Sequence, residues 1–258
     1  MIVFENITKA FPNRTVALED VTFTIDKGEF VFFIGPSGAG KTTILRLLLS
    51  EIKPTSGIVR IEGEDISLLK KNKLPALRRQ IGAIFQDYKL LEDHTVKENV
   101  AMVSEMLKRT NEEIATQVEE ILATVGLKEK ADLFPTQLSG GELQRTAIAR
   151  ALTTNPKILF ADEPTGNLDP ISGWEIIKLL QKINQAGTTV MVATHSEEIV
   201  NALKKRIIEL EKGRIVRDTK EAKTHKEKTG EKKTEDDSKE DKHKEETQET
   251  KAGKAREE

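Results

Sequence analysis

The stretch Gly35-Pro36-Ser37-Gly38-Ala39-Gly40-Lys41-Thr42 decides the fold of this chain. It fits the pattern G-x-x-x-x-G-K-[ST], in which glycines let backbone N–H groups turn inward around phosphate oxygens. The apolar run Phe30 to Ile34 before it predicts a buried strand, and a helix is expected from Thr42 to Leu49. This context is the one that a nucleoside triphosphate site requires. We therefore expect Lys41 to reach the β- and γ-phosphates and the Thr42 hydroxyl to ligate Mg²⁺.

Two adjacent acids, Asp162 and Glu163, follow the apolar run Ile158 to Ala161. Ligands of open α/β sheets bind at the carboxyl ends of the strands. We expect Asp162 to hold Mg²⁺, directly or through water, and Glu163 to act as the general base for the attacking water. Adjacent carboxylates at a strand end are usually ordinary surface charge. The phosphate loop upstream and His195 downstream favour the functional interpretation.

A second candidate anion site is the segment Leu138-Ser139-Gly140-Gly141-Glu142. It offers a hydroxyl and backbone N–H groups at the start of a helix predicted over about 140–152. Ser139 and Glu142 also fit an ordinary capping box, and both interpretations can hold together. Because the chain already has one full phosphate site, the second is best explained as serving the γ-phosphate of a partner subunit. This predicts a head-to-tail homodimer in the ATP state, with two shared sites.

The phosphate loop, the Ser139 segment and the Asp162-Glu163 pair, in this order, resemble the ATP-binding cassette family, and the resemblance covers residues 1–218. It implies that Phe11 stacks on adenine, although a core position is the simpler alternative. It also matches Gln86 with a glutamine that senses Mg²⁺. The predicted catalytic residues are Glu163, His195 and Gln86, and the predicted metal ligands are Thr42, Gln86 and Asp162. The predicted ATP-binding residues are Phe11, Gly35, Pro36, Ser37, Gly38, Ala39, Gly40, Lys41, Thr42, Thr43, Ser139, Gly140, Gly141 and Asp169.

Two further positions, Asp169 and His195, take their roles from the resemblance. It matches Asp169 with the acid of a loop that crosses the dimer interface. It matches His195 with the histidine that contacts the γ-phosphate and orients the catalytic water, whereas a lone histidine after a strand is ordinarily structural. Thr43 is expected to support the α-phosphate.

The composition changes sharply near Thr219. Residues 219–258 contain 12 Lys/Arg and 13 Asp/Glu but no aromatic residue and no Ile, Leu, Val or Met, which predicts a charged, disordered tail. Residues 1–218 are predicted to form one α/β nucleotide-binding domain of the P-loop type. Strands alternating with helices indicate a mainly parallel central sheet, with an antiparallel N-terminal β portion and a helical subdomain over about 86–151.

Further apolar patterns predict individual elements of this domain. Short strands are expected at Ile81 to Phe85 and at Thr189 to Ala193. Helices are expected over Glu112 to Val125, with Gly126 as the C-cap, and over Ile176 to Ile183.

Composition also limits the cellular context. The chain has no cysteine, which excludes disulfides, and a net charge of −2, which gives no general reason to bind nucleic acid. No secretory signal is visible, and no apolar run approaches the ~20 residues of a membrane span. We therefore expect a cytoplasmic protein that reaches the inner face of the membrane only through a partner.

Within the family, the stretches Ile84 to Leu91, Thr95 to Val100 and Asp162 to Pro170 resemble the cell-division ATPases. That resemblance implies an integral membrane partner and an indirect link to cell-wall hydrolases. The main alternative is a sister ATPase of lipoprotein release or macrolide efflux. A DNA-associated cassette is disfavoured, because those typically carry a long coiled coil or zinc-binding insertions between the two nucleotide motifs. A P-loop kinase or GTPase has no place for the Ser139 segment or for His195.

Overall fold

A computed structural model describes residues 1–220 of the chain. Met1–Arg217 form one folded unit. The prediction of a disordered tail over 219–258 concerns residues that lie, from 221 on, outside the described part.

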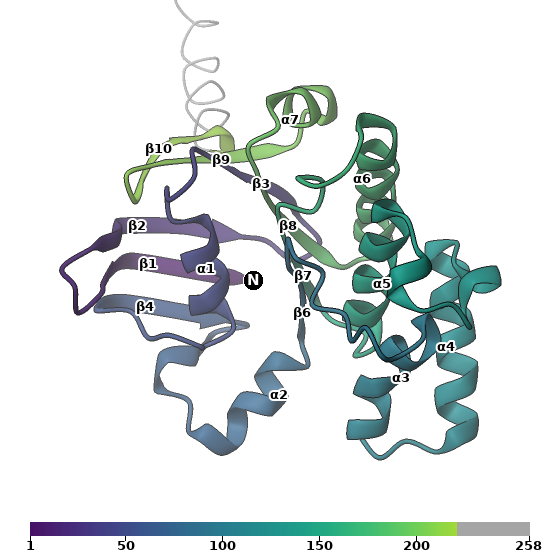
Figure 1. The fold of residues 1–258 in the computed structure, drawn as a ribbon. Coiled ribbons are helices and arrows are strands. Elements are labelled where there is room, and N and C mark those ends of the chain that lie inside the picture. Colours follow the sequence, from purple (N-terminus) through teal and green to yellow (C-terminus); the bar gives the residue numbers. More distant parts are fainter. Residues whose placement is uncertain (221–258) are drawn as a thin grey trace, which may run out of the picture. The chain divides into compact units, whose positions relative to one another are not determined.

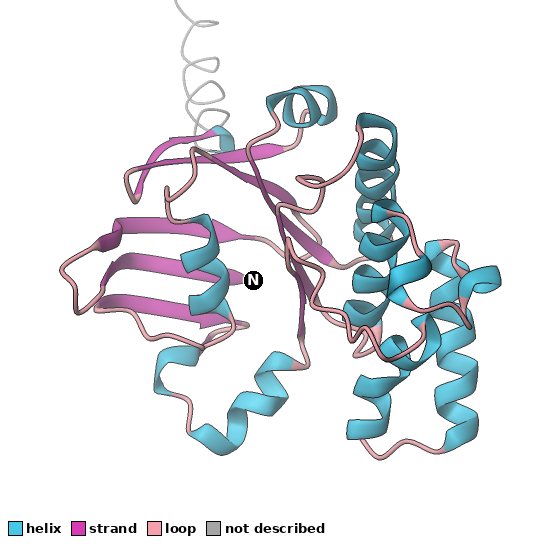
Figure 2. Ribbon diagram, viewed as in Figure 1, coloured by secondary structure: helices cyan, strands magenta, loops and turns pink. Residues whose placement is uncertain are grey.

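The central sheet has six strands in the order β10-β9-β3-β8-β7-β6 (Figure 1). Figure 2 shows the strands in magenta and the helices in cyan. The pairs β9/β3, β3/β8, β8/β7 and β7/β6 are parallel, which confirms the mainly parallel sheet. The strand bounds are β3 Phe30–Ile34, β6 Ile81–Ile84, β7 Ile158–Asp162, β8 Thr189–Thr194, β9 Arg206–Glu211 and β10 Arg214–Asp218.

A second sheet, with the order β2-β1-β4-β5, forms the antiparallel N-terminal portion. Its strands are β1 Ile2–Ala10, β2 Val16–Ile25, β4 Ser56–Ile61 and β5 Glu64–Asp65. A column of phenylalanine rings joins the two sheets. The centroids of Phe4 and Phe23 lie 4.5 Å apart, those of Phe23 and Phe33 5.4 Å, and those of Phe33 and Phe160 6.2 Å. These rings, with helix α1 (Lys41–Leu48), make one half of the core.

The other face of the central sheet is covered by helices, which gather on one side in Figure 1. They are α3 Val96–Met106, α4 Asn111–Val125, α5 Gly140–Leu152 and α6 Pro170–Gln185. Side chains alternate along β3, so that Phe30 and Phe32 pack against this helical layer and Val31 and Phe33 against the other half. Gly126, at φ +73°, ends α4 as a left-handed C-cap, as the sequence predicts.

Two short helices and four 3₁₀ turns complete the described part. They are α2 Leu74–Arg78 and α7 Glu197–Leu203, with the turns Ile66–Leu68, Lys71–Lys73, Lys128–Lys130 and Pro135–Gln137. In the described range no helix combines the length and apolarity that a membrane crossing demands.

The parallel strands deliver the predicted site residues to one edge of the sheet. The phosphate loop follows β3, Gln86 lies two residues after β6, Asp162 ends β7, and His195 directly follows β8. Because β3, β8, β7 and β6 are neighbours in the sheet, residues distant in sequence meet at these strand ends.

Candidate nucleotide site

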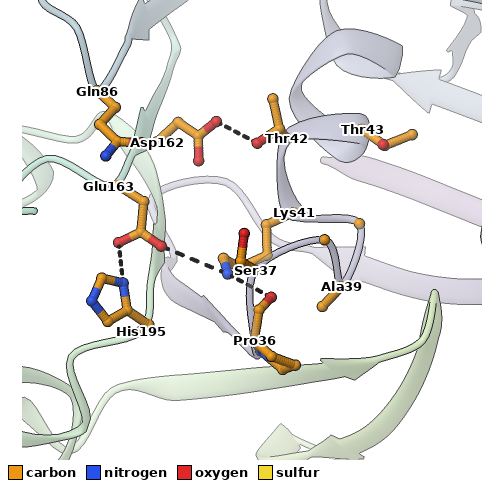
Figure 3. Close-up of a pocket in the computed structure, with 12 residues that line it drawn as sticks. Pro36, Ser37, Ala39, Lys41, Thr42, Thr43, Gln86, Asp162, Glu163 and His195 are labelled. Atoms are coloured by element: carbon orange, nitrogen blue, oxygen red, sulfur yellow. Dashed lines mark hydrogen bonds and ion pairs between the residues drawn. The ribbon is translucent and has the colours of Figure 1, made fainter.

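A cavity of about 560 Å³ opens where these strand ends meet (Figure 3). Its lining contains most of the predicted phosphate loop together with the side chains from β6, β7 and β8. The lining residues are Pro36, Ser37, Gly38, Ala39, Gly40, Lys41, Thr42, Thr43, Gln86, Asp162, Glu163 and His195.

The phosphate loop owes its course to glycine. Gly40 has φ +111°, and a Cβ there would lie 2.7 Å from the carbonyl oxygen of Ala17 and 2.6 Å from Cδ2 of Leu18. Only a residue without a side chain can therefore connect β3 to α1 along this path. The tight loop leaves backbone N–H groups and the N-terminus of α1 available to an anion.

Lys41 lies at the centre of the loop and is only 7% exposed. Its Nζ donates to the carbonyl oxygen of Gly35 at 2.6 Å and to that of Pro36 at 3.3 Å. It also lies 3.6 Å from Oε1 of Glu163. A buried ammonium group with these acceptors is suited to bind phosphate oxygens, which would replace the protein acceptors around it.

The Thr42 hydroxyl donates to Oδ2 of Asp162 at 2.7 Å. Burial raises the pKa of Asp162, and the nearby Glu163 charge adds to this, while the Thr42 hydrogen bond and the Lys41 charge oppose it. Hydroxyl, carboxylate and the Gln86 carboxamide are oxygen donors of the kind that Mg²⁺ prefers. In residues 1–220 no three His, Cys, Asp or Glu side chains group to hold a metal alone. The residues present therefore fit an ion that takes its remaining ligands from phosphates and water.

Glu163 connects the phosphate loop to His195. Its Oε2 lies 3.0 Å from Nδ1 of His195, and its Oε1 faces Lys41. Its backbone is left-handed, at φ +50°, and is held by a hydrogen bond from its N–H to the carbonyl oxygen of Ala193 at 2.8 Å. Such a conformation costs a non-glycine residue about 1–3 kcal/mol, and it aims this carboxylate into the cavity.

The remaining predicted site residues do not line this cavity. Phe11 is half-buried, with Nζ of Lys9 5.2 Å from its ring centroid, so it is not a core residue. Gly35 is not among the lining residues, but its carbonyl oxygen accepts a hydrogen bond from Lys41.

The Ser139 segment begins α5 as a capping box. The Ser139 backbone N–H and hydroxyl donate to Oε2 of Glu142 at 2.8 and 2.9 Å, and the hydroxyl accepts from the Glu142 N–H at 3.4 Å. These bonds hold the pKa of Glu142 below its usual range. The capping interpretation is therefore correct, and Ser139, Gly140 and Gly141 lie outside the cavity of their own chain.

Asp169 is the N-cap of α6. Its Oδ1 accepts from the backbone N–H groups of Ser172 and Ile171, each at 3.0 Å, and hydrogen bonding with Ser172 is the main reason why its pKa lies below the usual range. It lines a smaller cavity of about 220 Å³ that also borders Glu163 and His195.

Two side chains contact the turn after Gln86, and neither was given a role of its own from the sequence. The Asn167 side chain donates to the carbonyl oxygen of Gln86 at 3.2 Å. Arg150, from α5, donates to the carbonyl oxygens of Tyr88 and Lys89. Nothing in the local sequence indicates the Arg150 contacts, because they join residues about 60 positions apart.

Comparisons with known proteins agree with this geometry. The sequence profile of the family described as "ABC transporter" matches residues 18–166. The chain is 50% identical over 218 residues to the cell division ATP-binding protein FtsE of Bacillus subtilis (strain 168), covering 84% of this chain and 96% of that protein. It is 44% identical over 215 residues to FtsE of Escherichia coli (strain K12), covering 83% and 97%. A solved dimeric ATP-binding cassette, in a post-hydrolysis state bound to ADP and Pi, superimposes with a TM-score of 0.77 at 38% identity and covers 84% of this chain and 97% of that one.

Proposed function

This chain belongs to the ABC transporter family of ATP-binding proteins, and on that premise we propose that it is the ATP-hydrolysing subunit of a membrane complex that acts in cell division. As a member of the family it binds ATP and is an ATPase, and its FtsE relatives place it in cell division. The observation that carries the proposal is the convergence of Lys41, Glu163 and His195 on one cavity, in a chain that covers nearly the whole length of those relatives.

Hydrolysis would proceed by in-line attack of water on the γ-phosphorus. Glu163 accepts a proton from this water as the new P–O bond forms and the bond to the β–γ bridging oxygen breaks, which yields ADP and phosphate. His195, 3.0 Å from the Glu163 carboxylate, holds it in place, and Lys41 stabilises charge on the β- and γ-phosphates. Thr42, Asp162 and Gln86 would hold Mg²⁺, which when bound neutralises phosphate charge.

A second copy of the chain would complete the site. Ser139, Gly140 and Gly141 present a hydroxyl and N–H groups at the start of α5, outside their own cavity, where they can meet the γ-phosphate on a facing subunit. Asp169 would lie at the same interface, and Phe11 would stack on adenine. ATP would hold the two subunits together, and loss of phosphate would let them part.

The proposed partner is an integral membrane protein that resembles FtsX. A groove of about 380 Å³ between β6, α3 and α5 offers it a docking place. Its lining includes the apolar side chains of Phe85, Met102 and Val103 and the cationic side chains of Arg78, Lys89 and Arg150. Such a groove suits an amphipathic helix with acidic residues. The chain would then be cytoplasmic, at the inner face of the membrane, and closure of the dimer would act through the partner on cell-wall hydrolases.

The test is to isolate the membrane partner. The tagged full chain and its Lys41→Ala variant are each purified from detergent-solubilised membranes, and the co-purifying proteins are identified by mass spectrometry. We expect both to retain one FtsX-like protein and only the unchanged chain to hydrolyse MgATP. Retention of a lipoprotein-release or efflux permease instead would overturn the assignment to cell division, and absence of MgATP hydrolysis would overturn the enzymatic role.

A further inference from the structure

The four residues Gln86 to Lys89 follow β6 in an unusual backbone conformation. Tyr88 and Lys89 both have positive φ, at +57° and +53°, although neither is glycine. The Lys89 N–H donates to the carbonyl oxygen of Asp87 at 2.5 Å, and the Tyr88 N–H to that of Phe85 at 3.2 Å. Two successive left-handed residues are costly for side chains with a Cβ, so they persist only where surrounding groups hold them.

The group that holds them is the guanidinium of Arg150. Its Nη2 donates to the carbonyl oxygen of Tyr88 at 2.8 Å, and its Nη1 to that of Lys89 at 2.5 Å. The planar fork of arginine can bind both carbonyl oxygens at once, which a lysine ammonium cannot do in the same geometry. Burial lowers the pKa of Arg150, although an arginine remains charged at neutral pH.

The N-terminal end of the same helix lies close to the Tyr88 side chain. A Cβ on Gly140 would lie 3.7 Å from the Tyr88 hydroxyl and 3.1 Å from Cδ2 of Leu168, so the first turn of α5 lies close to both side chains. Asn167, the neighbour of Leu168, donates to the carbonyl oxygen of Gln86 at 3.2 Å. The turn is thus fixed at both of its ends, by Asn167 at Gln86 and by Arg150 at Tyr88 and Lys89.

We propose that Arg150 is a positioning residue for ATP hydrolysis. Arg150 fixes the turn from Gln86 to Lys89 and so holds the Gln86 carboxamide in the lining of the nucleotide cavity. The inference rests on the proposed function, because it takes Gln86 to act on the metal and the attacking water. Arg150 also lines the groove proposed for the membrane partner. A helix that enters this groove can therefore shift Gln86 by displacing one guanidinium.

The first experiment measures the turn without requiring activity. The chain has no cysteine, so Asp87→Cys provides a single site for a nitroxide spin label. Asp87 is exposed, and its ion pair with Lys89 lies at the surface and contributes little. We expect the electron paramagnetic resonance spectrum of the label to be broad with Arg150 present, because the label's motion is restricted. With Arg150→Lys the spectrum should be narrow, because the label moves freely. The control is Arg145→Lys, also on α5, where the side chain donates to Glu175. Equal label mobility in all three proteins would overturn the inference, whether or not the chain hydrolyses ATP.

The second experiment asks whether Arg150 acts through Gln86. Turnover is measured in the full chain for Arg150→Lys, Gln86→Ala and the double variant. A displacement of about 1 Å in a catalytic constellation costs up to ~100-fold in rate, so we expect Arg150→Lys to lower kcat by about tenfold or more, with a much smaller change in KM. The loss should disappear when Gln86→Ala is already present. An undiminished loss in the double variant would overturn the inference, because Arg150 would then act by another route.

Discussion

The ammonium group of Lys41 contacts three acceptor groups. Two are carbonyl oxygens of the phosphate loop, and the third is the Glu163 carboxylate. Their arrangement means that a triphosphate would replace one set of acceptors by another, so the ammonium never has to be buried without partners. This exchange explains how a lysine that is 7% exposed can remain available to a ligand.

Removing that ammonium should abolish most of the nucleotide affinity. Charge-assisted hydrogen bonds contribute about 1.5–3 kcal/mol each, so we expect Lys41→Ala to weaken ATP binding by at least ~10-fold in isothermal titration calorimetry. Lys182→Ala, an exposed lysine on α6, serves as the matched control and should leave the affinity unchanged. An unaltered dissociation constant for Lys41→Ala would contradict the phosphate cradle.

Asp162 illustrates how a functional carboxylate can oppose stability. Burial raises its pKa in the folded chain, so the folded state binds this proton more tightly than the unfolded state does. The contribution of this group to the free energy of unfolding is fully favourable below its unfolded pKa of ~3.9, and it is lost as the pH rises through the folded pKa. Above its folded pKa, the ionised group therefore destabilises the fold.

Asp162→Asn should accordingly be more stable than the unchanged chain. The amide oxygen can still accept the Thr42 hydrogen bond, while the buried charge is removed. In EDTA, scanning calorimetry should give a higher melting temperature at pH 7, with the difference closing as the pH falls toward ~4. A melting temperature below that of the unchanged chain at pH 7 would show that the carboxylate stabilises the fold instead.

At the level of elements, three helices begin with the same device. Thr95, Thr110 and Ser139 each form a capping box with a glutamate three residues on. The box satisfies N–H groups at the helix start and explains local stability equally well for all three. Only at α5 do two glycines follow the cap, and only there do we propose a second role.

This repetition provides a matched comparison for Ser139. Ser139→Ala and Thr110→Ala should each cost about 1 kcal/mol of unfolding free energy in denaturant titrations, since each removes one cap. Only Ser139→Ala should also reduce ATP-dependent association of two chains, measured by analytical ultracentrifugation. Equal association of the two variants would show that Ser139 acts only as a helix cap.

The elements that sequence predicted well are those with strong local patterns. The apolar runs gave β3, β6, β7 and β8 to within about one residue, and Gly126 correctly ended α4. Strands β9 and β10 were not predicted. Arg206–Glu211 is short and only partly buried, and it becomes a strand by pairing with β3, with Arg206 opposite Val31. The N-terminus of α6 was set too late, because Asp169 was assigned to an interface and its capping role was overlooked.

The site residues also differ in how far local sequence patterns predict them. The convergence of Lys41, Thr42, Asp162 and Glu163 on one cavity could be predicted, because each lies in a short motif at a strand end. The contacts of Arg150 could not, because they depend on the packing of α5 against a turn about 60 residues earlier.

At the scale of the whole molecule, the fold places the predicted nucleotide ligands in two separate regions. Four parallel strands bring one set of groups to a single cavity, while Ser139 is held at the head of α5 outside it. Under the proposed function, a chain built in this way would respond to ATP by association, because the ligands at the head of α5 would serve only another copy. Hydrolysis would then change the assembly as well as the nucleotide.

Glu163→Gln should therefore trap the associated state. The amide keeps the size of the side chain but cannot accept the proton of the attacking water, so ATP would remain bound between two chains. Light scattering in saturating MgATP should show a doubling of the 28.8 kDa mass for this variant, and the monomer mass when Ser139→Ala is added. ADP in place of ATP should give monomers of both proteins, because it lacks the γ-phosphate that we propose the two chains share. A Glu163→Gln chain that stays monomeric while calorimetry shows ATP bound would mean that one copy encloses the nucleotide unaided.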